Sequence, residues 1–291
     1  MTTLDVSTLA GNPSGAERPA AGHMDNAWLQ VDKTSDPGFF IRFLDASRAR
    51  ALEFARQNPE LAFAHLALEP GLSVLDCGCG TGDMLALIAK VISPGQAVGG
   101  DLSQAMIQEA LRRAKASVGE NLRFDTMDVQ SLPFPEKSFD RVLATQLLIH
   151  VPDPRGAMRE ICRVTRPNGW VAIADMDWDG LLVGCSDKEL GRRFTRLFCD
   201  GIRSGLVVRD YAGWLRAEGF GNIRIIPQPI LFDSWAFVRE WVIDPSLSYF
   251  VAQGSMSAKE ANEFVDDLDH RNAAGLFFAA APSYTVVGQR P

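Results

Sequence analysis

Two kinds of apolar pattern alternate through the middle of this chain. Five short apolar runs have the length of buried strands: 73–77, 96–101, 122–125, 139–145 and 169–175. Between them, three segments carry apolar residues at helical spacing: 82–91, 103–116 and 154–165. Strands that alternate with helices in this way predict a parallel sheet with helices packed on both of its faces.

Helical patterns also precede and interrupt this unit. Apolar residues over 37–68 fit two amphipathic helices, with Asn58 and Pro59 as the break between them. Later segments predict helices at 188–203, 209–218, 235–241, 245–253 and 257–272, and strands at 222–230 and 283–287. Residues 1–22 are rich in small and polar residues without apolar periodicity, so we expect a disordered leader before structure begins near Asn26.

Composition narrows the class of protein. The 291 residues are 46% apolar and 22% charged, which is enough to bury a full globular core. A formal charge of −7 argues against a nucleic-acid partner, because the surface has no general attraction for phosphate. The absence of a long apolar run and of a signal-peptide pattern predicts a cytoplasmic protein without a membrane span. The five cysteines and four histidines form no spacing typical of a metal site, so we expect reduced thiols and no metal.

A glycine-rich stretch, VLDCGCGTGD, lies where the first strand becomes a helix. Gly78, Gly80 and Gly82 have the spacing G-x-G-x-G, whereas a dinucleotide site has G-x-G-x-x-G. Asp76 precedes them, and a carboxylate there is unsuited to a phosphate and suited to an ammonium group. Glycines in such a turn let a ligand approach backbone N–H groups; the alternative is a turn that only packs strand on helix.

Polar residues at the next strand ends indicate what else the ligand carries. Asp101, in GGDLSQAM, is placed to accept hydrogen bonds from two ribose hydroxyls, with Met106 one turn further on. Asp128 follows the third strand, where it can accept an adenine amine while Val129 packs near the ring, and Gln146 ends the fourth strand. An ammonium, a ribose and an adenine without a phosphate site describe S-adenosylmethionine.

On these motifs, together with LLIHVPDP and EICRVTRPNGW, the sequence resembles the class I S-adenosylmethionine-dependent methyltransferases. It is most similar to the small-molecule branch that includes ubiquinone and menaquinone biosynthesis enzymes. The resemblance implies a Rossmann-like, mostly parallel sheet of seven strands, the last one antiparallel, with helices on both faces. The cofactor set that it implies includes the neighbours of the motif residues: Asp76, Gly78, Cys79, Gly80, Asp101, Leu102, Met106, Asp128, Val129 and Gln146.

The same resemblance suggests how the chain is divided. Residues 23–70 form an N-terminal helical lid, 71–180 the cofactor-binding core, and 181–291 the rest of the sheet with inserted helices that form a substrate lid. Such a lid over the strand ends would enclose a largely apolar pocket. The aromatic candidates for substrate contact are Trp28, Phe40, Trp178, Phe198 and Trp241, although aromatic residues at helical spacing also serve as core.

Two residues are candidates for catalysis. His150 lies just past the fourth strand and has a side chain suited to proton transfer near neutrality, or else it packs below the cofactor. Asp177 follows the fifth strand, where it either contacts substrate or caps a loop. The predicted function is methyl transfer, by in-line displacement, to a small hydrophobic or aromatic metabolite. The alternatives are a non-catalytic S-adenosylmethionine-binding domain and, on the glycine motif alone, a nicotinamide oxidoreductase.

Overall fold

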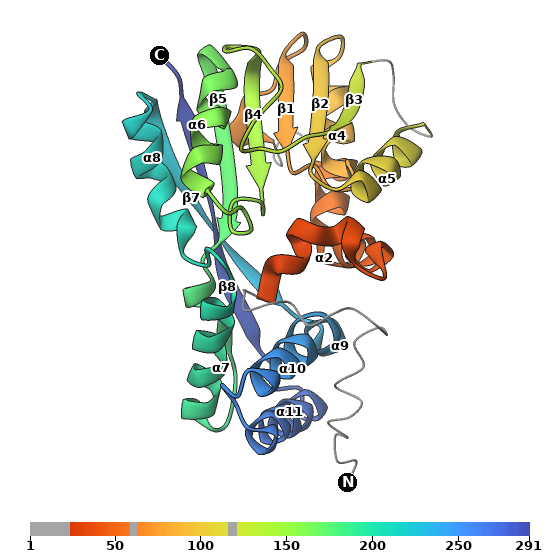
Figure 1. Cartoon of the computed structure of the whole chain (residues 1–291), viewed down its shortest axis with the longest axis vertical. Coiled ribbons are helices and arrows are strands. Elements are labelled where there is room, and N and C mark those ends of the chain that lie inside the picture. Colours follow the sequence, from red (N-terminus) through yellow and green to blue (C-terminus); the bar gives the residue numbers. More distant parts are fainter. Residues whose placement is uncertain (1–23, 59–62, 116–120) are drawn as a thin grey trace.

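One mixed sheet forms the centre of the computed structural model, which describes residues 24–58, 63–115 and 121–291 (Figure 1). Eight strands build it: β1 (Ser73–Cys77), β2 (Gln96–Asp101), β3 (Leu122–Thr126), β4 (Phe139–Thr145), β5 (Thr165–Met176), β6 (Leu182–Val183), β7 (Gly221–Phe232) and β8 (Ala279–Gln289). Their order is β3-β2-β1-β4-β5-β8-β6, and β7 pairs with the other edge of β8. The predicted leader at 1–22, Pro59 and Ala116 lie outside the described residues.

The directions of the strands confirm the predicted α/β class. Strands β1 to β5 are parallel to one another, whereas β8 runs antiparallel to both β5 and β7. The expected number of seven strands was wrong by one, because Leu182 and Val183 pair with Ala280 and Ala279 of β8 as an eighth. A strand of two residues is too short to produce an alternating pattern.

Two helical layers cover the sheet because its strands present alternate residues to opposite faces. Val74 packs against α4 (Asp83–Ile92), in a cluster that also includes residues of α5 (Gln104–Ala114). Leu75, the next residue, belongs to the cluster under α6 (Pro154–Val164) and α8 (Tyr211–Ala217). Because β1 to β5 run parallel, they all end at the same edge of the sheet, which is the lower edge in Figure 1.

The N-terminal segment lies across this carboxyl edge (Figure 1). It consists of a 3-10 segment, η1 (Met24–Lys33), and of α2 (Pro37–Gln57). We expected a second α-helix before residue 68. Residues 63–68 of this segment are described, and their only helical element is the 3-10 turn η2 (Ala64–Leu66), so the expectation was wrong for these residues. Arg141 explains this difference, because its guanidinium donates to the carbonyl oxygens of Leu66 at 2.6 Å and Ala67 at 2.8 Å, in place of helical N–H groups.

A group of helices is inserted around the long strands β7 and β8 and lies beyond the sheet edge in Figure 1. They are α7 (Lys188–Gly201), α9 (Trp235–Val238), the π-helical η5 (Arg239–Ile243), α10 (Asp244–Ala252) and α11 (Ala258–Ala273). Two separate helices were expected at 235–241 and 245–253, but α9, η5 and α10 follow one another without a break. Pro245 has no N–H to donate, and the wider turn at η5 accommodates it.

Candidate active site

A large open cavity of about 3050 Å³ lies at the carboxyl edge, between the strand ends, the η1–α2 segment and the inserted helices. All but two of the site residues expected from the sequence line it. The exceptions are Cys79 and Asp177. Among the residues that the structure describes, no helix is long and apolar enough to cross a membrane, and no cluster of His, Cys, Asp and Glu side chains is arranged to hold a metal ion.

The glycine turn after β1 forms one end of the cavity. Gly78 and Gly80 have φ angles of +72° and +54°, in the left-handed region that favours glycine. A Cβ atom at Gly78 would lie 2.8 Å from a methyl carbon of Leu147, and one at Gly80 would lie 2.9 Å from a methyl carbon of Leu44. The turn thus exposes backbone where side chains would leave no space.

The third glycine has a different role. Gly82 is the N-cap of α4 with a φ of +75°, and a Cβ atom there would lie 2.5 Å from the ring of Phe124. Gly82 therefore lets β3 pack on α4. The packing explanation considered for the whole motif applies to this position, while Gly78 and Gly80 line the cavity.

Asp76 places a buried carboxylate beside this turn. Its residue is 8% exposed, and burial raises its pKa to about 7 against the opposing effect of the Arg48 guanidinium. Asp101 of β2 also lines the cavity, and burial raises its pKa. A buried carboxylate of this kind gains most from a cationic ligand, because the ligand charge offsets the loss of hydration.

Asp101 already organises the backbone around it. One carboxylate oxygen accepts the N–H of Gly80 at 3.0 Å, and the other accepts the N–H of Ser103 at 2.9 Å. Each carboxylate oxygen has a second acceptor position, so both can still accept a hydroxyl. Asp101 therefore links the glycine turn to the start of α5 while it faces the cavity.

Further along the edge, the third and fourth strand ends complete this side of the cavity. Asp128 accepts the backbone N–H of Gln130 at 2.8 Å, and Val129 beside it is buried against the core. Gln146 has a left-handed φ of +53° and donates its N–H to Ala174 at 2.7 Å, which turns the chain at the end of β4. Leu102 and Met106 also face this space.

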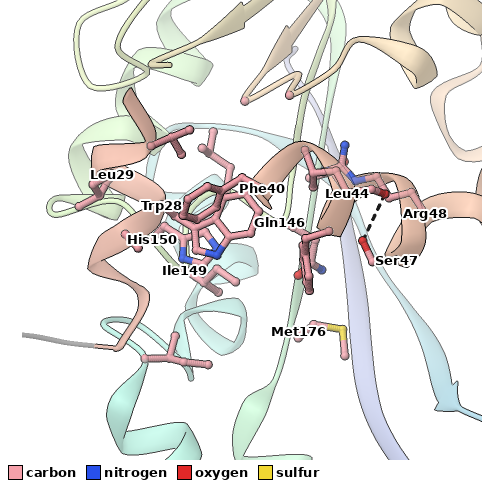
Figure 2. Close-up of a pocket in the computed structure, with 18 of the residues that line it drawn as sticks. Trp28, Leu29, Phe40, Leu44, Ser47, Arg48, Gln146, Ile149, His150 and Met176 are labelled. Carbon is pink, nitrogen blue, oxygen red and sulfur yellow. Dashed lines mark hydrogen bonds between the residues drawn. The ribbon is translucent and has the colours of Figure 1, made fainter. Parts of the chain in front are cut away.

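Aromatic rings from η1, α2 and the inserted helices form the opposite end. The Trp28 ring stacks on His150 with centroids 5.6 Å apart and contacts the edge of Phe40 at 4.9 Å (Figure 2). Phe43 lies 5.6 Å from Trp28 and 5.7 Å from Trp241, which connects η1 to η5 through α2. These contacts bring Trp28 and Phe40 close to Trp241, which comes from a segment about 200 residues later in the sequence.

Trp178 and Phe198 form a second aromatic contact on the β5 side. Their rings meet edge to face at 5.0 Å, and both residues line the cavity. Trp178 belongs to the 3-10 turn η3 (Trp178–Gly180), and Phe198 to α7. The cavity is thus bordered by rings from five elements: η1, α2, η3, α7 and η5.

Two expected site residues point elsewhere. Both carboxylate oxygens of Asp177 accept from Arg209, at 2.7 and 2.9 Å, and Arg209 also pairs with Asp179 at 2.9 Å. This arrangement favours the loop-capping role of Asp177 over a catalytic one. Cys79, expected in the cofactor set, packs its side chain in the core beside α4 and donates its N–H to the carbonyl oxygen of Gly100 at 3.0 Å, so it lies outside the cavity lining.

Arg48 was missed in the sequence. It lines the cavity next to the glycine turn, and its Nη1 atom lies 3.5 Å from the position that a Cβ of Gly80 would occupy. The available signal was its place in α2: Phe40, Leu44 and Leu52 are buried at four-residue steps, and Arg48 interrupts this apolar row. A charged residue in the buried row of an amphipathic helix calls for a compensating charge nearby.

The comparisons with known proteins agree with this geometry. A family model described as a methyltransferase domain matches residues 68–200. An uncharacterised 37.1 kDa protein from a Streptomyces fradiae transposon is 34% identical over 255 residues, covering 86% of this chain and 71% of the relative. The chain belongs to the class I S-adenosylmethionine-dependent methyltransferases. This membership sets aside the alternative of a nicotinamide oxidoreductase.

A named relative of this methyltransferase matches over part of the chain. The 2-phytyl-1,4-naphtoquinone methyltransferase of Synechococcus elongatus is 42% identical over 115 residues, which cover 38% of this chain and 48% of that enzyme. The alignment therefore spans about half the length of that relative. It supports the small-molecule branch of the family.

Solved structures share the fold at low sequence identity. YcgJ of Bacillus subtilis superposes with a TM-score of 0.54 at 20% identity, covering 79% of this chain and 96% of that protein. Phosphoethanolamine N-methyltransferase 2 of Haemonchus contortus, solved with S-adenosyl-L-methionine, has a TM-score of 0.52 at 18% identity and covers 81% and 52%. Both similarities show that this methyltransferase shares the fold of the two solved proteins.

Proposed function

We propose that this methyltransferase transfers a methyl group from S-adenosylmethionine to a small, largely hydrophobic or aromatic metabolite. The observation that carries the proposal is one cavity with two unlike ends. Backbone and carboxylates surround the glycine turn, and aromatic side chains surround the space beyond Trp28. The first end suits a cationic, hydroxyl-rich donor, and the second suits an apolar acceptor.

The donor assignment follows the order of the strand ends. Asp76 accepts the ammonium group of the methionine moiety, and the backbone at Gly78 and Gly80 lies along it. Asp101 accepts the ribose hydroxyls. Asp128 accepts the adenine amine. The remaining members of the set are Leu102, Met106, Val129 and Gln146, whose side chains border the same space.

The residues of the chain align the acceptor with the methyl donor and exclude water from the site. When bound, the donor offers a methyl carbon to an acceptor lone pair, and the electrons of the breaking carbon–sulfur bond stay on sulfur. The aromatic wall keeps the acceptor in line with that carbon and excludes water, which is where catalysis of such a displacement mainly comes from. Charge is dispersed during the reaction, so few side chains need to change protonation.

His150 is the proposed base for an oxygen or nitrogen acceptor. It lines the cavity at the turn after β4, and the stacked Trp28 ring holds its orientation. An imidazole can take the proton that the acceptor loses as the new bond forms. A hydroxylated ring or a quinol, the reduced form of a quinone, carries such a proton and suits the aromatic wall. The naphthoquinone named for the Synechococcus relative is a related ring system and supports this class of acceptor.

A methyl-transfer assay tests the proposal. The protein is incubated with S-adenosylmethionine that carries a deuterated methyl group and with a panel of hydroxylated aromatic and quinol compounds, and products are identified by mass spectrometry. We expect a deuterated methyl product and S-adenosylhomocysteine in equal amounts. Tight donor binding without product from any acceptor would instead favour the non-catalytic binding domain.

A further inference from the structure

Arg48 of α2 faces the donor end of the cavity. Figure 2 shows Leu44, Ser47 and Arg48 projecting from α2 beside the pocket. The Arg48 guanidinium lies against the glycine turn: its Nη1 atom is 3.5 Å from the point where a Cβ atom on Gly80 would lie. Asp76 and Asp101 act on it electrostatically, but within the described part of the chain it makes no direct ion pair with either. Nearby carboxylates therefore balance its charge, and because Arg48 lines the cavity, an anion bound there can reach its guanidinium.

The charges at this end match those of the methyl donor. Two carboxylates face one guanidinium, which leaves an excess of negative charge around the glycine turn. S-adenosylmethionine carries a sulfonium, an ammonium and one carboxylate, so it brings an excess of one positive charge. Asp76 accounts for the ammonium group. The carboxylate of S-adenosylmethionine needs a hydrogen-bond donor from the protein close to the same turn. Arginine is suited to this task, because its planar fork binds a carboxylate with two parallel hydrogen bonds.

Resting on the proposed function, we propose that Arg48 binds the carboxylate of the methionine moiety and so holds α2 closed over the bound donor. The methionine end then lies between two opposite charges, Asp76 from the sheet and Arg48 from the lid. The guanidinium makes its contact only when α2 is in place, so the donor links the two parts of the site.

Other contacts keep α2 and η1 close to this position. Asp45 of α2 forms a two-point ion pair with Arg113 at 2.7 and 3.0 Å, and Arg113 also binds Asp83 of α4 at 2.6 Å. Asp32 accepts the N–H groups of Gln104 and Ala105 at 2.7 and 3.0 Å at the start of α5. The lid is thus tied to α5 directly, and to α4 through Arg113.

The same lid carries part of the acceptor wall. Phe40 and Phe43 lie one to two turns before Arg48 on α2 and contact Trp28 and Trp241. Closing α2 on the donor carboxylate therefore also positions the rings that contact the acceptor. Arg48 is a positioning residue for the acceptor and a binding residue for the donor.

Calorimetry with two donors tests this assignment. S-adenosylmethionine and its decarboxylated form share the ammonium, ribose and adenine and differ in the carboxylate. The wild-type protein should bind S-adenosylmethionine about 10- to 100-fold more tightly, the scale for hydrogen bonds to a charged group. Arg48→Met should remove this preference by weakening S-adenosylmethionine binding, with little change for the decarboxylated donor. Arg56→Met, on the exposed side of α2 away from the cavity, is the matched control and should keep the preference.

Further variants separate the two proposals. Asp76→Asn should weaken binding of both donors, since both carry the ammonium. Failure of S-adenosylmethionine to bind wild-type protein, or no effect of this variant, counts against the proposed function. Equal wild-type affinities for the two donors, or an equal loss of both in Arg48→Met, overturns the Arg48 assignment alone. Arg48→Lys, which keeps the charge and loses the fork, applies the same test if the methionine variant does not fold.

Hydrogen exchange gives an independent readout of the lid. S-adenosylmethionine should slow amide exchange across Pro37–Gln57 in wild-type protein, and the decarboxylated donor should do so much less. In Arg48→Met the two donors should give the same exchange. Equal protection of α2 by both donors in the wild-type protein would contradict the closure of α2 by the carboxylate.

Discussion

The proposed donor end and the proposed acceptor end of the cavity differ in what forms their walls. At the donor end, backbone turns at Gly78 and Gly80 and carboxylates of neighbouring strands make the surface. At the acceptor end, side chains make it: Trp28 from η1, Phe43 from α2 and Trp241 from η5 meet through ring contacts. A wall of backbone and fixed charges can recognise one cofactor, whereas a wall of rings from separate elements can change its shape by substitution without disturbing the sheet.

The largest expected effect concerns the acceptor end. His150→Gln should lower the turnover number about 100-fold for an oxygen or nitrogen acceptor, because positioned proton transfer contributes at least this much. Donor affinity should stay unchanged, since His150 lies on the Trp28 side of the cavity. Steady-state kinetics and calorimetry measure the two effects separately. A normal turnover number across the pH range would remove His150 as the base.

The next largest effect concerns the donor end. Asp76→Asn should weaken S-adenosylmethionine binding by about 1.5–3 kcal/mol, the scale for a hydrogen bond between charged partners. Binding of methylthioadenosine, which lacks the amino-acid part, should change little. Calorimetry of both ligands checks the difference. An equal loss for both would mean that the substitution damages the cavity as a whole.

Acidification should weaken binding of the methyl donor. Burial raises the pKa of Asp76 to about 7, and an ammonium ligand selects its charged form. Donor affinity should therefore fall as the pH drops below about 7, by up to about tenfold per unit when one proton must leave. Calorimetry at pH 6 and pH 8 measures this, and Asp76→Asn should flatten the dependence.

Asp76 should also affect the stability of the ligand-free protein, with a pH dependence opposite to that of donor binding. The pKa of Asp76 is higher in the folded protein than the ordinary value of 3.8, so the folded state binds more protons between these values. The free energy of unfolding should rise from this group as the pH falls from about 7 to about 4. Denaturant titrations of wild-type protein and Asp76→Asn isolate the contribution, and equal slopes in the two would contradict the buried carboxylate.

A smaller effect is expected from the aromatic wall. Trp241→Ala removes ring contacts with Phe39 and Phe43 at 4.7 and 5.7 Å. The Michaelis constant for the acceptor should rise about 2- to 10-fold, the range for aromatic pair contacts, while donor affinity stays within a factor of two of wild type as an order-of-magnitude expectation. Steady-state kinetics at saturating donor measures it. A loss confined to donor binding would reverse the division between the two ends.

The smallest effect should come from Asp177→Asn. The substitution weakens a two-point pair with Arg209, which is half exposed, so the free energy of unfolding should fall by about 1 kcal/mol or less. Turnover should be unchanged, because Asp177 does not line the cavity. Chemical denaturation and kinetics check both points. A large loss of turnover with normal stability would restore the catalytic assignment.

The donor end could be predicted from the sequence because its determinants are local. Asp76 and Gly78 are fixed by the end of β1, and Asp101 by the end of β2, so parallel strands bring them to one edge. Local spacing did not separate Gly82, which packs against Phe124, from the glycines that face the cavity. Nor did it show that the Cys79 side chain turns into the core.

The acceptor end and the lid depend on how distant elements dock. The ring contacts of Trp28 with Phe43, and of Phe43 with Trp241, follow from the packing of η1, α2 and η5, which no local pattern contains. Arg48 stood in an apolar row, but only the position of α2 shows which part of the sheet it faces. The partner of Asp177 is likewise set by the tertiary fold, because Arg209 comes from a later 3-10 turn, η4 (Val207–Asp210).

A crystal structure with S-adenosylhomocysteine tests the central claim most directly. The account predicts that the amino group of the product lies within hydrogen-bonding distance of Asp76, its ribose hydroxyls at Asp101, and its adenine between Asp128 and Val129. The aromatic space beyond Trp28 should remain available to the acceptor. A product bound elsewhere, with the glycine turn empty or holding a diphosphate, would contradict it.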